Sequence, residues 1–296
     1  MTAPIRHGAL ALLVGVTVIA AAAGLARAAR APAGVADARI VSSFVMHGRV
    51  TTAVRVRGER RGQRVTRAWT FTGLGCAGEM CPRLRVRRQR SAHRFDTLTL
   101  SRVGVGSYAG SGRFASALRC RGRRFAHALV VPYTVQVQVT QVVVIEGIPF
   151  AEAVRATYTN RRRIDHTRCP IGPSHDAARY TGTAAPLPSP PAATFSVAVS
   201  PGTDTATFTD TSTPGAGGAP VVGRVWDFSD PASGAANSAT ASPVAHTFSA
   251  PGTYEVSLTV IDANGLTGAS AQTVTVPGLQ PSKATVASTA LSSPIS

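Results

Sequence analysis

Acidic residues, lysine and aromatic side chains are scarce in this chain of 296 residues. It has 14 Asp and Glu against 31 basic residues, all but Lys283 are arginine, and aromatic residues make up 6%. The few aromatics predict cores that are mainly aliphatic. Hydrophobic residues at 44% and a mean hydropathy of +0.10 exclude both a disordered polymer and a protein with many membrane spans.

The common catalytic signatures are also missing. The sequence has no GxSxG elbow, no HExxH helix and no Cys-His nucleophile pattern. We therefore expect no catalytic residue and no enzyme, with a hydrolase site in the first domain as the alternative. Its candidate residues are the histidines and aspartates of that domain: His47, His93, His127, His166, His175, Asp96, Asp165 and Asp176.

No long stretch shows a helical pattern, whereas several short stretches alternate between apolar and polar residues. In YTVQVQVT, Val135, Val137 and Val139 alternate with polar residues, as a strand with one buried face requires. The sequence therefore predicts an all-β protein whose N-terminal domain is an antiparallel β barrel or sandwich. Further candidate strands are 40–46, 49–57, 64–72, 83–88, 95–102 and 112–120.

The first residues have the outline of a secretory signal. Arg6 and His7 precede an uncharged apolar run from Gly8 to Ala26, and small residues allow cleavage after Ala28. This predicts a signal peptide over residues 1–28 and a secreted or cell-surface protein. An uncleaved anchor is the alternative, because about 18 apolar residues can span a bilayer.

In an oxidising compartment, four cysteines predict two disulfides. Of the three connectivities we favour Cys76–Cys81 with Cys120–Cys169, because GCAGEMC resembles a short loop closed at its base. A zinc site would need a second cluster of ligands, which the scattered histidines do not supply. We expect no metal and no cofactor here.

A proline-rich run divides the chain into two regions of opposite charge. Residues 186–192 predict a stiff linker between an arginine-rich domain at 37–185 and a second domain at 193–277. The first region has 26 arginines against eight acids, a net charge of +18, and the second has a net charge of −5. Residues 278–296 lack periodicity, and we expect a disordered tail there.

The arginines of the first domain are candidate contacts for anions, because alternate residues of a strand share one face. Acidic polysaccharides, cell-wall polymers and lipid head groups suit an exported protein better than nucleic acid does. The competing interpretation is an ordinary solvated sheet face. The candidates are Arg83, Arg85, Arg87, Arg88, Arg121, Arg123 and Arg124.

The second domain carries ordered motifs: VWDFSD, then HTFSAPGTYEVSLTVIDANG, then AQTVTVP. They resemble the core of a PKD repeat, WDFGDG, HxY and PGxYxVxLxVxDxxG, with Ser229 in place of a glycine and Phe248 in place of a tyrosine. The resemblance covers 193–277 and implies an Ig-like β-sandwich. The core residues that it assigns are Trp226, Asp227, Phe228, His246, Tyr254, Val256, Leu258 and Val260.

Asp227 lies between the two aromatic residues of VWDFSD, and Asp230 follows them. Short acids at strand ends accept backbone N–H groups, so we interpret both as residues that organise a loop. A loose calcium site with Asp210 or Asp262 is the weaker alternative, and acid/base catalysis is the weakest.

These features predict an exported, noncatalytic binding or adhesion protein. The resemblance implies that the PKD-like module is a spacer or contacts protein or polysaccharide. A further alternative is a lipocalin-like protein that binds a small ligand, which needs a barrel with an open interior.

Overall fold

The computed structural model describes residues 34–35, 37–76, 81–167, 169, 172–217 and 219–277. The signal peptide expected at 1–28 and the tail expected at 278–296 lie outside the described residues, and both stay predictions. The described part is nearly all β-strand, as predicted, with one short 3-10 helix at Pro231–Asn237. No helix among these residues is long and apolar enough to cross a membrane.

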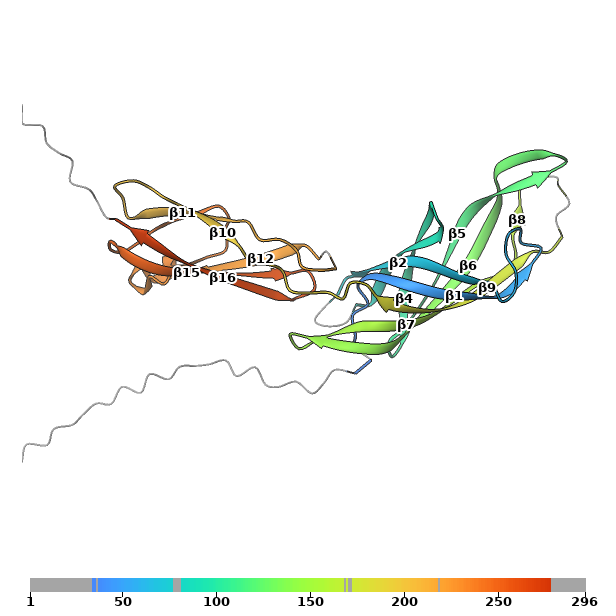
Figure 1. Ribbon diagram of the computed structural model, residues 1–296, viewed down its shortest axis with the longest axis horizontal. Helices are drawn as coiled ribbons and strands as arrows, with labels where there is room; N and C mark the ends of the chain where they lie inside the picture. Colours follow the sequence, from blue (N-terminus) through green and yellow to red (C-terminus); the bar gives the residue numbers. More distant parts are fainter. Residues whose placement is uncertain are drawn as a thin grey trace, which may run out of the picture. The chain divides into compact units, whose positions relative to one another are not determined.

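The N-terminal domain is an antiparallel barrel. Eight strands follow the cyclic order β1-β2-β3-β4-β5-β6-β7-β9, and the β5–β6 pairing closes the ring (Figure 1). The two-residue strand β8 pairs with β6 outside this ring. The strands are β1 (Ser42–Val54), β2 (Arg64–Leu74), β3 (Arg83–Ser91), β4 (Arg94–Gly104), β5 (Ser107–Cys120), β6 (Arg123–Ile145), β7 (Ile148–Asn160), β8 (Ile164–Asp165) and β9 (His175–Ala184).

Strand β1 corrects one expectation from the sequence. Residues 40–46 and 49–57 are expected as two separate strands, but β1 is one strand from Ser42 to Val54 and continues through Gly48. Gly48 faces the inside of the barrel, and a Cβ there would lie 2.3 Å from the ring of Tyr180. The glycine therefore gives space to an aromatic ring and does not form a turn.

The barrel interior changes character along its axis. Phe44, Met46, Phe71 and Leu100 belong to a buried apolar cluster that fills one part of it. The next inward position after Val86 on β3 is Arg88, and the next inward position before Leu98 on β4 is Asp96. The interior is therefore a packed core that becomes polar toward one end, as in other eight-stranded barrels whose inside is filled by side chains.

The C-terminal domain is an Ig-like sandwich of two sheets. One sheet has the order β10-β11-β14 and the other β13-β12-β15-β16 (Figure 1). Phe195 and Phe208 from the first sheet pack with Trp226, Leu258 and Val274 of the second. The strands are β10 (Phe195–Val199), β11 (Thr205–Asp210), β12 (Val221–Asp227), β13 (Ser238–Ala239), β14 (Val244–Thr247), β15 (Gly252–Asp262) and β16 (Thr267–Val276).

Candidate anion-binding surface

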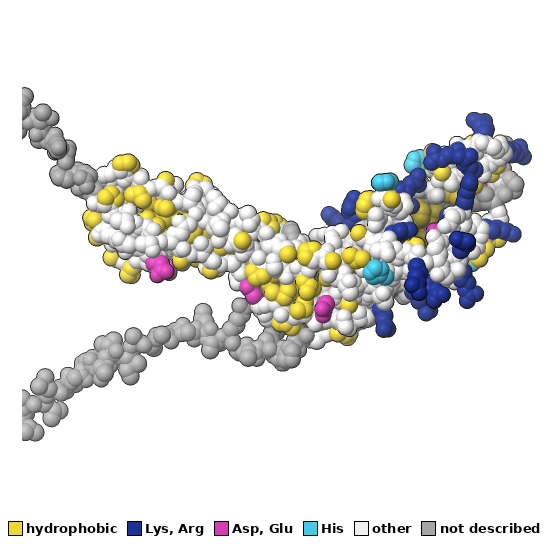
Figure 2. Space-filling view, in the orientation of Figure 1, with side chains coloured by type: hydrophobic (Ala, Val, Ile, Leu, Met, Phe, Trp, Pro, Cys, Tyr) yellow, Lys and Arg dark blue, Asp and Glu magenta, His cyan; other side chains and the backbone are white. Residues whose placement is uncertain are grey.

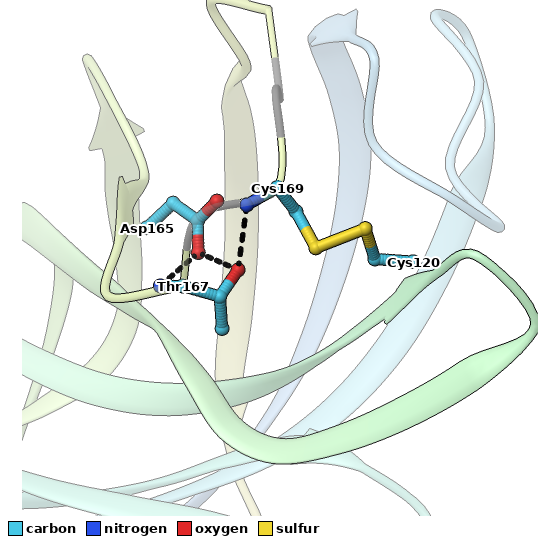
Figure 3. The surroundings of a disulfide bond; sticks show 4 residues. All are labelled: Cys120, Asp165, Thr167 and Cys169. Atoms are coloured by element: carbon cyan, nitrogen blue, oxygen red, sulfur yellow. Dashed lines mark hydrogen bonds between the residues drawn. A yellow bond between two sulfur atoms is a disulfide. The ribbon is translucent and has the colours of Figure 1, made fainter.

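Both expected disulfides are present. Cys76 is bonded to Cys81, and Cys120 at the end of β5 is bonded to Cys169. Next to the second bond, Asp165 Oδ1 accepts hydrogen bonds from the backbone N and the Oγ1 of Thr167, at 2.8 and 2.7 Å (Figure 3). Cys169 N donates in turn to Thr167 Oγ1 at 3.3 Å. Asp165, a candidate for catalysis in the sequence, therefore orders the segment that holds the disulfide.

The arginines at the β5–β6 turn lie beside this disulfide. Arg121 and Arg123 are exposed, and Arg123 stands opposite Cys120 in the β5–β6 pairing. Arg124 is exposed too and is opposite Arg119. The three candidates of this turn are thus brought together at one hairpin tip.

Arg83, Arg85 and Arg87 occupy the outer face of β3, as the alternation predicts. All three are exposed, while Leu84 and Val86 between them are buried in the barrel. The neighbouring outward residues of β2 and β4 carry hydroxyls: Thr72 and Thr99 both stand opposite Arg85. This row is a cationic and hydroxyl-rich strip.

Arg88 does not belong to this strip. Its side chain shares the inward face with Leu84 and Val86, is 4% exposed, and binds Asp96. The alternation in RLRVRR already indicates this inward placement, because Arg88 stands an even number of positions from the two buried apolar residues. The structure therefore removes Arg88 from the outer anion contacts.

A second row of arginines, which the sequence analysis missed, crosses three strands. Arg49 of β1 stands directly opposite Arg64 of β2 on one side and Arg179 of β9 on the other. All three side chains are exposed, and Figure 2 shows arginine side chains gathered over one part of the barrel surface. Residues opposite each other in an antiparallel pair have Cβ atoms about 5 Å apart. We call Arg64, Arg49 and Arg179 the cross-strand arginine row.

The row borders an open hollow of about 900 Å³ that has no acidic residue in its lining. Arg155 adds a fourth guanidinium there, and Thr66, Thr157 and Thr181 add hydroxyl groups. Like charges directly opposite each other destabilise a sheet. An anion that binds between them removes this repulsion, and the threonine hydroxyls can donate further hydrogen bonds to it.

The other acidic candidates of the barrel are bound to arginines. Asp176 Oδ1 accepts a hydrogen bond from Arg163 Nη2 at 2.9 Å, and both side chains are largely buried. Asp96 is bound by Arg88. The ring of His47 lies within reach of Thr66 Oγ1, at 3.3 Å. Among the described residues, no hydrogen bond joins Asp96 or Asp176 to a histidine, as a base and its orienting partner would require.

The two acids of the sandwich motif organise its loop, as the sequence analysis predicts. Asp227 is exposed and its Oδ1 accepts the backbone N of Ser229 at 2.9 Å. Asp230 is 1% exposed and accepts hydrogen bonds from the backbone N and the Oγ of Ser249, with His246 Nε2 at 3.2 Å. Burial raises the pKa of Asp230, but these hydrogen bonds outweigh it and the net pKa is lowered.

The remaining residues of the motif form the core or a corner of the sandwich. Trp226 and Phe228 are buried, as are His246, Val256, Leu258 and Val260. The hydroxyl of Tyr254 donates to the carbonyl of Ala250 at 2.8 Å, which ties down a corner as sandwich folds often do. These contacts give each of these motif residues a structural role in the sandwich.

The other acids of the sandwich serve separate loops. Asp210 is paired with Arg224 at 2.7 Å, and Asp262 Oδ1 accepts the backbone N of Asn264 and of Leu266. In the part of the chain that the structure describes, no three His, Cys, Asp or Glu side chains gather in a group that could hold a metal.

Comparisons with known proteins agree with the motifs of the sandwich. Residues 188–277 match the family model of the PKD domain. Two solved structures resemble this part: the PKD1 domain of the Vibrio cholerae metalloprotease PrtV (25% identity, TM-score 0.26) and the PKD1 domain of Vibrio anguillarum Epp (22% identity, TM-score 0.27). They cover 30% and 31% of this chain and 99% of their own. No curated protein matches the chain.

The family model begins at residue 188, five residues before the start expected from the motifs. This agrees with the pairing of Ala192, whose backbone N donates to Thr213 O and whose O accepts from Thr213 N, both at 3.0 Å. The PKD family is one of noncatalytic accessory or binding modules, and the two disulfides indicate an extracytoplasmic protein. Residues 188–277 are a PKD domain, joined to an eight-stranded barrel that no family model matches.

Proposed function

We propose that this protein is an exported, noncatalytic binding protein whose barrel binds anionic polymers through its outer face. The observation that carries the proposal is the cross-strand arginine row, in which Arg64, Arg49 and Arg179 stand opposite one another with no acid beside them in the hollow that they border. Guanidinium groups bind phosphate and carboxylate through paired hydrogen bonds.

The spacing of the charges suits a polymer with repeated anionic groups. Adjacent strands lie about 4.8 Å apart, and alternate residues of one strand are about 6.7 Å apart. The cross-strand arginine row offers the first spacing, and Arg83, Arg85 and Arg87 on β3 offer the second. The hydroxyl groups beside both sets of arginines can form hydrogen bonds with sugar or phosphate oxygens of the polymer.

The PKD domain supports the role of a binding or accessory module. In this proposal it contacts an extracellular protein or polysaccharide, or holds the barrel at a distance from a surface, and its acids bind no metal. Export rests on the expected signal peptide together with the two disulfides. Cell-wall polymers and acidic polysaccharides are the proposed partners, and nucleic acid is not.

The test is retention of the full chain on immobilised heparin and on immobilised polyphosphate. We expect retention at low salt and release by about 0.2 M salt, as diffuse electrostatic binding requires. The variant R49S/R64S/R179S should lose most of the retention. The comparison variant R83S/R85S/R87S removes the same charge from β3 and should lose a smaller part of the retention, so it separates the row from the net charge of the barrel.

Equal losses in the two variants would show that the row has no special part in binding. Absence of retention at low salt for the unaltered chain would overturn the proposed function. Circular dichroism of both variants should match that of the unaltered protein, because all six side chains are exposed.

A further inference from the structure

A separate cavity lies inside the barrel, at its polar end. It measures about 380 Å³, and Ser91 and Arg94 at the turn between β3 and β4 contribute to its lining. Six arginines contribute to its lining, against two acids, Glu59 and Asp176. We call it the mouth cavity, and its arginines are Arg57, Arg67, Arg88, Arg90, Arg94 and Arg163.

Three of these arginines are already paired with acids, and the longest pair joins Arg90 Nε to Asp96 Oδ2 at 3.7 Å. Arg88 forms two hydrogen bonds with Asp96, and its Cζ lies 4.3 Å from the ring centre of Tyr133 and 4.7 Å from that of Tyr158. Arg163 is bound to Asp176. Arg88 is therefore a paired cation held among aromatic rings, and it forms a rigid part of the cavity lining.

The other arginines leave the cavity with an excess of positive charge. Arg57, Arg67 and Arg94 form no ion pair within the described residues, and Glu59 is the one lining acid without an arginine hydrogen-bonded to it there. Burial, followed by the nearby charge of Asp176, raises the pKa of Glu59.

Two buried donors of the lining have no acceptor. Arg90 Nε and Arg163 Nε are inaccessible to solvent and donate to no atom of the described residues. Buried donors of this kind are rare in proteins, because an unmade hydrogen bond costs free energy. Solvent does not reach these two atoms, so an anionic oxygen in the cavity accepts from them only when the guanidinium groups turn toward it.

Flat apolar surfaces stand beside these donors. Arg90 Cζ lies 3.8 Å from the ring centre of Phe114, and Phe114, Tyr158 and Tyr180 all line the cavity. The cavity thus combines cationic donors with aromatic walls. Its volume is near the lower limit of ligand pockets, which span about 300 to 1,000 Å³. A molecule with one ring fits this volume, whereas the length of a polymer does not.

We propose that the mouth cavity binds a small organic anion, a phosphate or carboxylate group carried on a flat ring. The anionic group is held by the lining arginines without an ion pair, Arg57, Arg67 and Arg94, and the ring lies against Phe114 and Tyr158. This site is distinct from the cross-strand arginine row, which lies on the outer face of the barrel wall. It does not depend on the proposed polymer binding.

Calorimetric titration of the full chain with phenyl phosphate, benzoate and benzyl alcohol tests the proposal. We expect saturable binding of at least one of the two anions, and at least about tenfold weaker binding of benzyl alcohol, which lacks the charge-assisted hydrogen bonds. Comparing phenyl phosphate with benzoate identifies the anionic group. Comparing phenyl phosphate with inorganic phosphate measures the contribution of the ring.

Two variants locate the binding. Arg94→Ser removes an exposed lining arginine, and we expect it to weaken the anion by about tenfold, the usual effect of losing one charge-assisted contact. Ser116→Trp should block the cavity, because Ser116 lines it. The matched control is Arg85→Ser, which removes the same charge from the outer face of β3 and should leave the affinity unchanged.

Three results would overturn the proposal. The first is no saturable binding of either anion at about 10 millimolar, which is about the weakest affinity of interest. The others are equal weakening of binding by Arg94→Ser and Arg85→Ser, and unchanged binding in a folded Ser116→Trp variant. The polymer test has an independent outcome. R49S/R64S/R179S should still bind phenyl phosphate, and Arg94→Ser should still be retained on heparin. The failure of one proposal therefore does not affect the test of the other.

Discussion

Arg88 and Asp96 form a two-point ion pair inside the barrel, with Nε to Oδ1 at 3.1 Å and Nη2 to Oδ2 at 2.8 Å. The side chains are 5% and 7% exposed. Burial lowers the pKa of Arg88, but the hydrogen bond and the charge of Asp96 outweigh it, and the net pKa is raised. Arg88 therefore keeps its charge, and it lies where the apolar core of the barrel ends.

Removing one partner of this pair should destabilise the barrel strongly. Asp96→Leu leaves a buried guanidinium without its carboxylate, which costs about 3 to 5 kcal/mol in buried pairs. Replacing both residues, Arg88→Met with Asp96→Leu, should restore a large part of the loss. Urea unfolding followed by fluorescence measures this, in a chain where Trp226→Phe leaves Trp69 as the one tryptophan.

The comparison with the double variant decides the interpretation. If Asp96→Leu alone costs no more than the double variant, the pair does not act as a coupled buried ion pair. Glu152→Gln, at an exposed position of β7, serves as a control for the loss of an acid and should change the stability little.

Asp230 predicts how the stability of the PKD domain depends on pH. Its folded pKa is lowered by Ser249 and His246 in spite of its burial. Its stabilising contribution is therefore complete above the ordinary pKa of an aspartate, about 3.9, and is lost as the pH falls through the lowered value. Asp230→Asn should be less stable than the unaltered domain at pH 7, and the difference should shrink toward pH 2.

This pH dependence is measured by unfolding a Trp69→Phe chain, in which Trp226 reports on the PKD domain. Glu255→Gln is the control, because this acid is exposed on β15. A constant difference between Asp230→Asn and the unaltered domain from pH 7 to pH 2 would contradict the role given to Asp230.

Ser229 stands where PKD repeats usually have glycine, and its φ of 53° is the left-handed conformation that glycine adopts without strain. Its hydroxyl donates to Glu255 O at 2.7 Å. For other residues this conformation costs about 1 to 2 kcal/mol, and a hydrogen bond contributes about 0.5 to 1.5 kcal/mol. Ser229→Gly should therefore be nearly neutral.

Ser229→Ala loses the hydrogen bond and keeps the strain, so we expect it to be less stable than the unaltered domain by about 1 kcal/mol. Thermal unfolding of both variants checks this ordering. An alanine variant as stable as the glycine variant would mean that the strain does not matter at this turn, and an alanine variant as stable as the unaltered domain would mean that the hydrogen bond does not.

The sequence predicted the PKD domain well because its determinants are local. Trp226, Phe228 and Tyr254 belong to strings whose order and alternation fix both the strands and the buried face. Alternation likewise placed Arg83, Arg85 and Arg87 outside the barrel. The position of a strand and its buried face could therefore be predicted from the residues of that strand alone.

The cross-strand arginine row could not be predicted in this way. Arg49 meets Arg64 and Arg179 through the register of two pairings, and one of these joins residues from opposite ends of the domain. Register depends on how the whole barrel closes, and a slip of one residue would turn each arginine to the other face. The mouth cavity has the same cause, since its lining comes from many strands and turns.

The disulfide between Cys120 and Cys169 should stabilise the barrel more than that between Cys76 and Cys81. The two bonds span 49 and 5 residues, and in the chain-entropy model the longer loop contributes about 4 kcal/mol and the shorter about 2 kcal/mol. The double variants C120S/C169S and C76S/C81S should therefore differ in urea midpoint, with the first less stable. Dithiothreitol should lower the midpoint of the unaltered chain and leave a chain without cysteines unaffected. If C76S/C81S proved the more damaging change, native contacts of the short loop, and not the restriction of the unfolded chain, would account for the effect of these bonds.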